Sequence, residues 1–121
     1  MTVVAWGPTV PIAQSAAQTA AESGISVELI DLVTLNPWDA HTVIESVKKT
    51  GRAVVVHEAA RTGGFGAEVA ATIQEEAFLS LEAPVARVTG YDTPFPVPSI
   101  EDFWIPDAAR IVRAVREARA Y

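Results

Sequence analysis

The residues best suited to chemistry lie in one stretch, where the apolar run Ala53–Val56 gives way to His57 and Glu58. A histidine beside a carboxylate can act as an acid/base pair, and open α/β sheets bind ligands at the carboxyl ends of their strands. Adjacent residues of a strand point to opposite faces, however, which separates these two side chains. We therefore predict that His57 is structural and makes one hydrogen bond.

A glycine-rich turn follows the same run. Gly63, Gly64 and Gly66 precede a predicted helix, so their backbone N–H groups could meet an anion with Arg61 beside them. The plainer interpretation, which we favour, is a tight turn that lets the helix pack closely. A contact with an anion or another subunit remains a hypothesis for this stretch, and the residues concerned are His57, Glu58, Arg61, Gly63, Gly64 and Phe65.

Several other kinds of site are argued against by the sequence. There is no Gly-x-Ser-x-Gly elbow, no Gly-x-x-x-x-Gly-Lys phosphate loop and no Gly-x-Gly-x-x-Gly fingerprint. The lack of cysteine excludes disulfides and zinc-thiolate sites, and two histidines, His41 and His57, are too few for a histidine-rich metal site. A net charge of −6 argues against nucleic-acid binding. No apolar run approaches the ~20 residues that span a bilayer, so we expect no membrane contact and a cytoplasmic location.

The elements that position these residues alternate along the 121-residue chain, which we interpret as a single domain, residues 1–121, and as part of a longer polypeptide. Thr9 is expected to cap the first helix, Asp39 to lie in the first turn of the second, and Gly51 to end it. Alternating strands and helices predict a mainly parallel sheet of about four strands in a three-layer α/β/α sandwich. The predicted strands are 2–6, 25–30, 53–56 and 85–88. The predicted helices are 9–24, 37–51, 66–77 and a last one that starts at 107.

The segment from Gly90 to Pro106 differs from the rest of the chain. Its prolines forbid a regular ladder, while its aromatic and aliphatic side chains favour burial. We expect an ordered, extended segment packed on a surface. Phe95, Phe103 and Trp104 are the candidate anchors for a docking partner.

The sequence resembles the C-terminal, transketolase-type domain of the beta subunit of thiamine-diphosphate-dependent 2-oxo acid dehydrogenases. The resemblance covers essentially the whole chain and is carried by His57–Gly66, Ala83–Gly90 and Ile105-Pro106-Asp107. Within that family, the sequence resembles the branched-chain 2-oxo acid enzyme more than the pyruvate enzyme. The segments that carry this preference are Pro37-Trp38-Asp39, Gln74–Leu79, Leu81–Pro84 and Gly90–Pro96. A pyruvate or acetoin dehydrogenase beta subunit is the alternative within the family.

The resemblance implies a sheet of this type with one further antiparallel edge strand contributed just upstream. It implies that thiamine diphosphate, Mg²⁺ and the catalytic histidines belong to the preceding domain and the alpha subunit, so no catalytic, cofactor-binding or metal-binding residue is assigned here. The implied role is non-catalytic. The domain would help build a heterotetramer with the alpha subunit and a second beta subunit, and would dock the subunit-binding domain of the acyltransferase core.

A free-standing flavodoxin-like or receiver-like module is the competing class. A receiver would need clustered acids after the first strand and a lysine late in the sheet, whereas the first strand ends at Trp6-Gly7 and the fourth at Thr89-Gly90. Bound flavin or phosphate would favour an anion-binding module. We predict that the isolated chain neither binds thiamine diphosphate nor decarboxylates a 2-oxo acid, an activity assigned to the parent complex.

Overall fold

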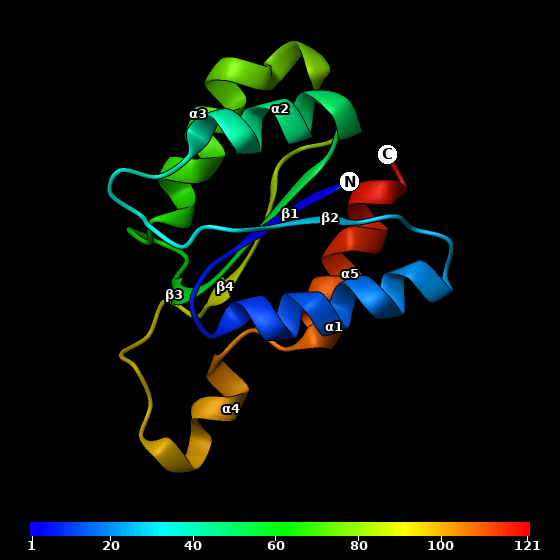
Figure 1. The fold of residues 1–121 in the computed structure, drawn as a ribbon. Helices are drawn as coiled ribbons and strands as arrows, with labels where there is room; N and C mark the ends of the chain where they lie inside the picture. The colour runs from blue at the N-terminus through cyan, green and yellow to red at the C-terminus, as the bar shows by residue number, and fades with distance from the viewer.

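The computed structural model describes all residues, 1–121. Its centre is one sheet of four parallel strands in the order β2-β1-β3-β4 (Figure 1). Neighbouring parallel strands require crossover connections, and the helices between the strands supply them. The strands are β1 (Thr2–Ala5), β2 (Glu28–Asp31), β3 (Ala53–Ala60) and β4 (Ala86–Gly90).

Helices cover both faces of the sheet, with α1 and α5 on one side and α2 and α3 on the other (Figure 1). The predicted α/β fold and three-layer sandwich are confirmed. The long helices are α1 (Thr9–Glu22), α2 (Ala40–Thr50), α3 (Gly66–Ala77) and α5 (Ala108–Arg119). The short ones are the 3₁₀ turns η1 (Phe78–Ser80) and η2 (Pro98–Ile100) and the single-turn helix α4 (Glu101–Trp104).

Alternation along the two central strands builds two separate cores, because successive side chains point to opposite faces. The core under α1 and α5 contains Val3, Ala5, Ala13, Ala16, Ala20, Val54, Val56, Val88, Ile111, Val112, Ala114 and Val115. The core under α2 and α3 contains Val4, Leu32, Val43, Ile44, Val47, Ala53, Val55, Val69, Ile73 and Ala77. A strand that is apolar at every position is therefore one that is buried on both faces.

Helix ends follow local chemistry with two departures from expectation. Asp39 is the N-cap of α2 and not a first-turn residue, since its carboxylate accepts the backbone N–H of Thr42 at 3.0 Å. Gly51 ends α2 in the left-handed conformation, as expected. The prediction that Thr9 caps α1 was wrong: its hydroxyl donates to the carbonyl of Trp6 at 2.8 Å.

Strand β3 is longer than the predicted run 53–56. It continues to Ala60, with a shift of register against β4 between Val56 and Ala60. His57 and Glu58 therefore lie inside the strand and not at its end. The strand extends beyond the buried apolar run because backbone pairing with β4 continues as far as Ala60. Ala59 is exposed, so burial no longer marks this last part of the strand.

The segment after β4 was expected to be extended and buried, and both expectations were wrong in part. It contains η2 and α4, and it projects beyond the end of the sandwich (Figure 1). Trp104 alone among its large apolar side chains is buried, while Phe95, Val97, Ile100 and Phe103 are exposed. No helix of the chain is both long and apolar enough to cross a membrane.

Candidate functional site

His57 is fully buried, with 0% of its surface exposed. Its ring stacks on the indole of Trp6, with centroids 5.1 Å apart and planes inclined by 7°. Neither Nδ1 nor Nε2 has a hydrogen-bond partner, so the predicted single hydrogen bond was wrong. Burial lowers the pKa of the imidazole, and the nearby charge of Arg87 lowers this pKa further. The residue is a neutral packing element that aligns β3 with the chain after β1.

The glycine turn is shaped by the same ring. Gly63 adopts a positive φ of 73°, whereas Gly64 does not. A Cβ on Gly64 would overlap the carbonyl oxygen of Ala60 and come within 2.7 Å of His57 Cε1, and a Cβ on Gly66 would overlap the imidazole itself. The glycines therefore allow α3 to lie directly against β3.

Phe65 begins this helix from a half-buried position between two indoles. Its ring meets Trp6 edge to face at 5.8 Å between centroids, and Trp38 in the same way at 6.3 Å. Such edge-to-face pairs are favourable beyond the area they bury. Phe65 thus links the chain after β1 to the chain before α2.

Arg61 belongs to a different surface. Its guanidinium donates to the carbonyl of Arg87 at 3.1 Å, and the guanidinium of Arg87 donates to the carbonyl of Arg61 at 3.1 Å. Next to this pair, the Asp92 carboxylate accepts the backbone N–H of Thr62 at 2.8 Å and its hydroxyl at 2.7 Å, and these bonds lower the pKa of Asp92. Arg61 is thereby held toward β4 and its following loop.

The six residues of the hypothesised contact therefore do not form one cluster. His57 is buried, Gly64 and Phe65 are half-buried, Gly63 is an exposed turn residue, and Arg61 points toward β4. Glu58 is half-buried and its carboxylate makes no hydrogen bond or ion pair with another residue of the chain. An acid/base pair of His57 and Glu58 is not assembled.

The segment 91–104 carries five of the nine large apolar side chains that are exposed in this chain. We call these five the apolar patch and define it as Tyr91, Phe95, Val97, Ile100 and Phe103. It surrounds a shallow hollow of about 620 Å³ that prolines 94 and 96 help to line. Exposed apolar surfaces of this kind mark interaction sites in many proteins. Of the three candidate anchors, Phe95 and Phe103 belong to this patch.

Trp104 has the opposite environment, with 8% of its surface exposed. Its ring lies against the backbone of Gly90, where a Cβ would overlap it, and 4.9 Å from the ring of Phe95 between centroids. Its Nε1–H donates to the hydroxyl of Thr93 at 3.1 Å. Trp104 therefore fastens the projecting segment to the sheet and supports the apolar patch from beneath.

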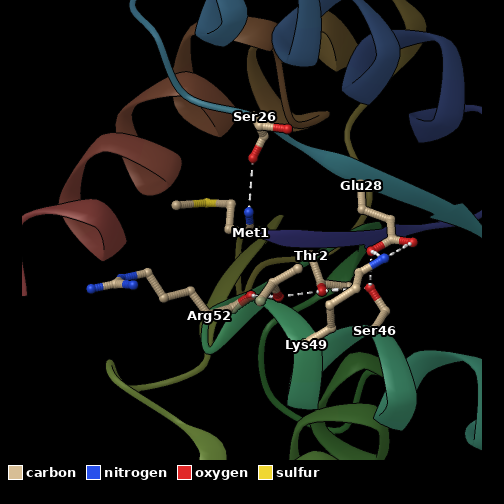
Figure 2. A network of polar contacts seen from close by, with 8 residues as sticks. Met1, Thr2, Ser26, Glu28, Ser46, Lys49 and Arg52 are labelled. Carbon is tan, nitrogen blue, oxygen red and sulfur yellow. Dashed lines mark hydrogen bonds and ion pairs between the residues drawn. The ribbon is translucent and has the colours of Figure 1, made fainter.

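A polar network at the amino ends of the strands was not predicted from sequence (Figure 2). The buried hydroxyl of Thr2 lies 2.7 Å from that of Ser46 and 2.7 Å from that of Thr50. Ser46 donates to Glu28 at 2.9 Å, and Lys49 lies 2.6 Å from the same carboxylate, so hydrogen bonds from Lys49 and then Ser46 lower the pKa of Glu28. The one sign of this network in the sequence is Ser46, a polar residue within the apolar stripe of α2.

The geometry of this network indicates a structural role and not a binding site. It joins β1, β2 and α2 through side chains that satisfy one another, and it leaves no buried donor or acceptor without a partner. No group of three or more histidine, aspartate or glutamate side chains gathers anywhere in the chain in a way that could hold a metal ion.

This chain is similar to a known domain family, to curated beta subunits of 2-oxo acid dehydrogenases and to a solved transketolase structure. Residues 1–111 match the family model described as "Transketolase, C-terminal domain". The chain is 51% identical to "2-oxoisovalerate dehydrogenase subunit beta, mitochondrial" of Dictyostelium discoideum, over 100% of this chain and 33% of that protein. It is 52% identical to "Pyruvate dehydrogenase E1 component subunit beta" of Leifsonia xyli subsp. xyli, over 99% of this chain and 36% of that protein.

A solved structure described as "Split gene transketolase, inactive beta4 tetramer" is similar to 98% of this chain and 38% of its own, with a TM-score of 0.84 and 29% sequence identity. A further relative, "2-oxoisovalerate dehydrogenase subunit beta 2, mitochondrial" of Arabidopsis thaliana, is 53% identical over 100% of this chain and 34% of its own length. The chain spans about a third of the length of the curated relatives it matches.

Proposed function

The chain belongs to the transketolase C-terminal domain family, and from that membership we propose that it is the C-terminal domain of the beta subunit of a thiamine-diphosphate-dependent 2-oxo acid dehydrogenase. The observation that carries this proposal is identity of 51–53% across the whole chain to beta subunits of such enzymes. The resemblance inferred from the sequence motifs is confirmed at the level of the family. It supports this class over a free-standing flavodoxin-like module.

The substrate we propose is a branched-chain 2-oxo acid. Relatives named for 2-oxoisovalerate match the full chain at 51% and 53% identity, and one named for pyruvate matches at 52%, so overall identity does not separate the two. The preference rests on the four short segments singled out in the sequence, which are Pro37-Trp38-Asp39, Gln74–Leu79, Leu81–Pro84 and Gly90–Pro96. Pyruvate is the alternative substrate.

The substrate proposal is tested with the parent beta subunit co-purified with its alpha subunit. Oxidative decarboxylation of 2-oxoisovalerate and of pyruvate is measured with an artificial electron acceptor at saturating thiamine diphosphate and Mg²⁺. We expect a higher kcat/KM for 2-oxoisovalerate. A higher kcat/KM for pyruvate assigns the chain to the alternative, and the absence of both activities contradicts the dehydrogenase proposal itself.

We assign the domain a role in assembly and docking and no role in chemistry. Thiamine diphosphate needs a cradle for its diphosphate, and its Mg²⁺ needs oxygen ligands from carboxylates, amides or carbonyls. The residues present do not fit these needs, because His57 is buried under Trp6, Gly64 and Gly66 are packed closely against the chain, and no trio of acids converges. We therefore place the cofactor and its metal in the remainder of the parent enzyme, and expect no Mg²⁺-dependent binding of thiamine diphosphate by this chain in calorimetry.

The apolar patch supports the docking role. Its prolines restrict the segment, so little conformational entropy is lost when a partner binds. The candidate partners are the alpha subunit, the second beta subunit and the subunit-binding domain of the acyltransferase core. A small basic domain would also be steered toward a chain of net charge −6.

The docking role is tested by a pull-down of the chain with the subunit-binding domain at low and high ionic strength. Phe103→Ser removes an apolar side chain that is 80% exposed within the patch, and Leu79→Ser removes one that is 97% exposed outside it. We expect binding that weakens with salt and with Phe103→Ser but not with Leu79→Ser. Binding that is absent at low salt, or equal in both variants, contradicts docking of the core at this patch.

A further inference from the structure

We propose that the groove between β4 and α5 is a binding site for a small polyanion that carries phosphate or carboxylate groups. The groove has a volume of about 530 Å³, which falls within the range of small-molecule sites. Its charged lining consists of four arginines, Arg61, Arg87, Arg110 and Arg113, against two acids, Asp92 and Glu117. This inference goes beyond the proposed assembly role and does not depend on it.

The first argument is that three of these arginines have no carboxylate partner. The chain holds fifteen acids and nine bases, and four of the bases form ion pairs: Lys48, Lys49, Arg52 and Arg113. Arg61, Arg87 and Arg110 form none, although acids outnumber bases. The four arginines and two acids of the groove sum to +2 in a chain of net charge −6. The groove is thus a positive site on an acidic molecule.

The second argument is that the guanidinium groups are held in place without being neutralised. Arg61 and Arg87 each donate one hydrogen bond to the other's backbone carbonyl at 3.1 Å. A guanidinium has five N–H donors in a planar fork, so most of the donors of each remain available. Groups that are already ordered lose less entropy when they bind a ligand.

Arg110 is held in the same manner from the other wall of the groove. Its guanidinium lies 4.8 Å above the ring centroid of Tyr91 and donates to the carbonyl of Thr89 in β4. Carbonyl oxygens and an aromatic face orient the cation but do not cancel its charge. Arginines from the end of β3, from β4 and from α5 therefore converge on one groove.

The two acids of the groove do not close it to anions. The Asp92 carboxylate accepts the backbone N–H and the hydroxyl of Thr62 and also lies near the charge of Arg61, so it offsets part of the charge of that one arginine. Glu117 is exposed and approaches only Arg113, at 3.9 Å. Arginine forks bind phosphate and carboxylate oxygens in bidentate fashion. A small anion with two or more such groups fits this arrangement better than an extended peptide, because the guanidinium groups of Arg61 and Arg110 already lie against β4.

The site is tested by isothermal calorimetry of the purified chain with inorganic pyrophosphate and with citrate, each compared with KCl at matched ionic strength. We expect saturable 1:1 binding of at least one of the two, and their relative affinity distinguishes a phosphate ligand from a carboxylate ligand. Arg87→Gln and Arg113→Gln should each weaken that binding, the former at least tenfold. The matched control is Arg119→Gln, which makes the same charge change on α5 outside the groove and should alter the affinity less than twofold.

Thermal melts show whether each variant is folded, and Arg113, which is 73% exposed, provides a variant that does not disturb packing. Failure of both probes to saturate overturns the proposal. Equal weakening by Arg119→Gln also overturns it, since that result reports general charge attraction. Tighter binding of an oligoglutamate peptide than of either small anion would replace the small-molecule site by a surface for an acidic chain.

Discussion

Replacing Trp104 by Ala should destabilise the whole domain, although the residue lies in a projecting segment. An indole buries about 150–250 Å², which at about 25 cal/mol per Å² corresponds to about 4–6 kcal/mol of transfer free energy. Measured losses for buried aromatic-to-alanine changes are about 3–5 kcal/mol. Trp104 also donates to Thr93 and lies against Gly90. We expect a loss of about 3–5 kcal/mol in the free energy of unfolding, a large part of the total for a domain of this size.

The measurement is urea unfolding followed by far-ultraviolet circular dichroism, with Phe103→Ala as the matched control. The control removes the neighbouring aromatic side chain, which is 80% exposed, so its effect should stay within about 0.5 kcal/mol. A loss below about 1 kcal/mol for Trp104→Ala with an unchanged m-value would refute the reasoning. An equal loss in the control would show that Trp104 holds the segment no more firmly than the exposed Phe103 does.

Two further predictions concern the packing around His57. Gly64→Ala should lower the free energy of unfolding by about 3 kcal/mol or more, because its Cβ would overlap a backbone carbonyl. Gly63→Ala should cost about 1 kcal/mol, since only the positive φ opposes it, and equal losses in urea titrations would contradict this ranking. The pKa of His57 is lowered in the folded state, so the unfolded chain binds the proton more readily. The contribution of this residue to the free energy of unfolding is therefore fully present above pH 6.5 and is lost as the pH falls. One proton gives a slope of at most about 1.4 kcal/mol per pH unit, and His57→Phe should reduce the slope of stability between pH 6.5 and 5; an unchanged slope would mean that His57 is not its source.

The order of elements could be predicted because it depends on local patterns. The apolar run Ala53–Val56 signals burial on both faces, and the spacing of Val43, Ile44 and Val47 signals one helix face. Gly51 and Asp107 mark helix boundaries through their own backbone and side-chain chemistry. Alternating strands and helices then leave few arrangements other than a parallel sheet covered on both sides.

The candidate sites could not be predicted in the same way, because distant segments build them. His57 makes no hydrogen bond, contrary to expectation, and its ring stacks instead on Trp6, which lies 51 positions earlier in the chain. The groove between β4 and α5 collects arginines from the turn after β3, from β4 and from α5, which no spacing in the sequence relates. Ser46 in the stripe of α2 was the only local signal for the polar network, and its partner Thr2 belongs to another element.

The sequence by itself therefore determined the four strands and the four long helices in their order, and with them the sandwich, since each of these stretches carries its own periodicity. It did not determine the end of β3 or the short helices of the segment after β4. Only the tertiary structure decided which polar and aromatic side chains meet. Phe103 and Trp104 show the difference most simply, because they are adjacent aromatic residues of one helical turn, and one is exposed while the other is buried. Successive residues of a helix point about 100° apart, so the side that faces Gly90 is fixed by how α4 docks and not by the composition of the segment.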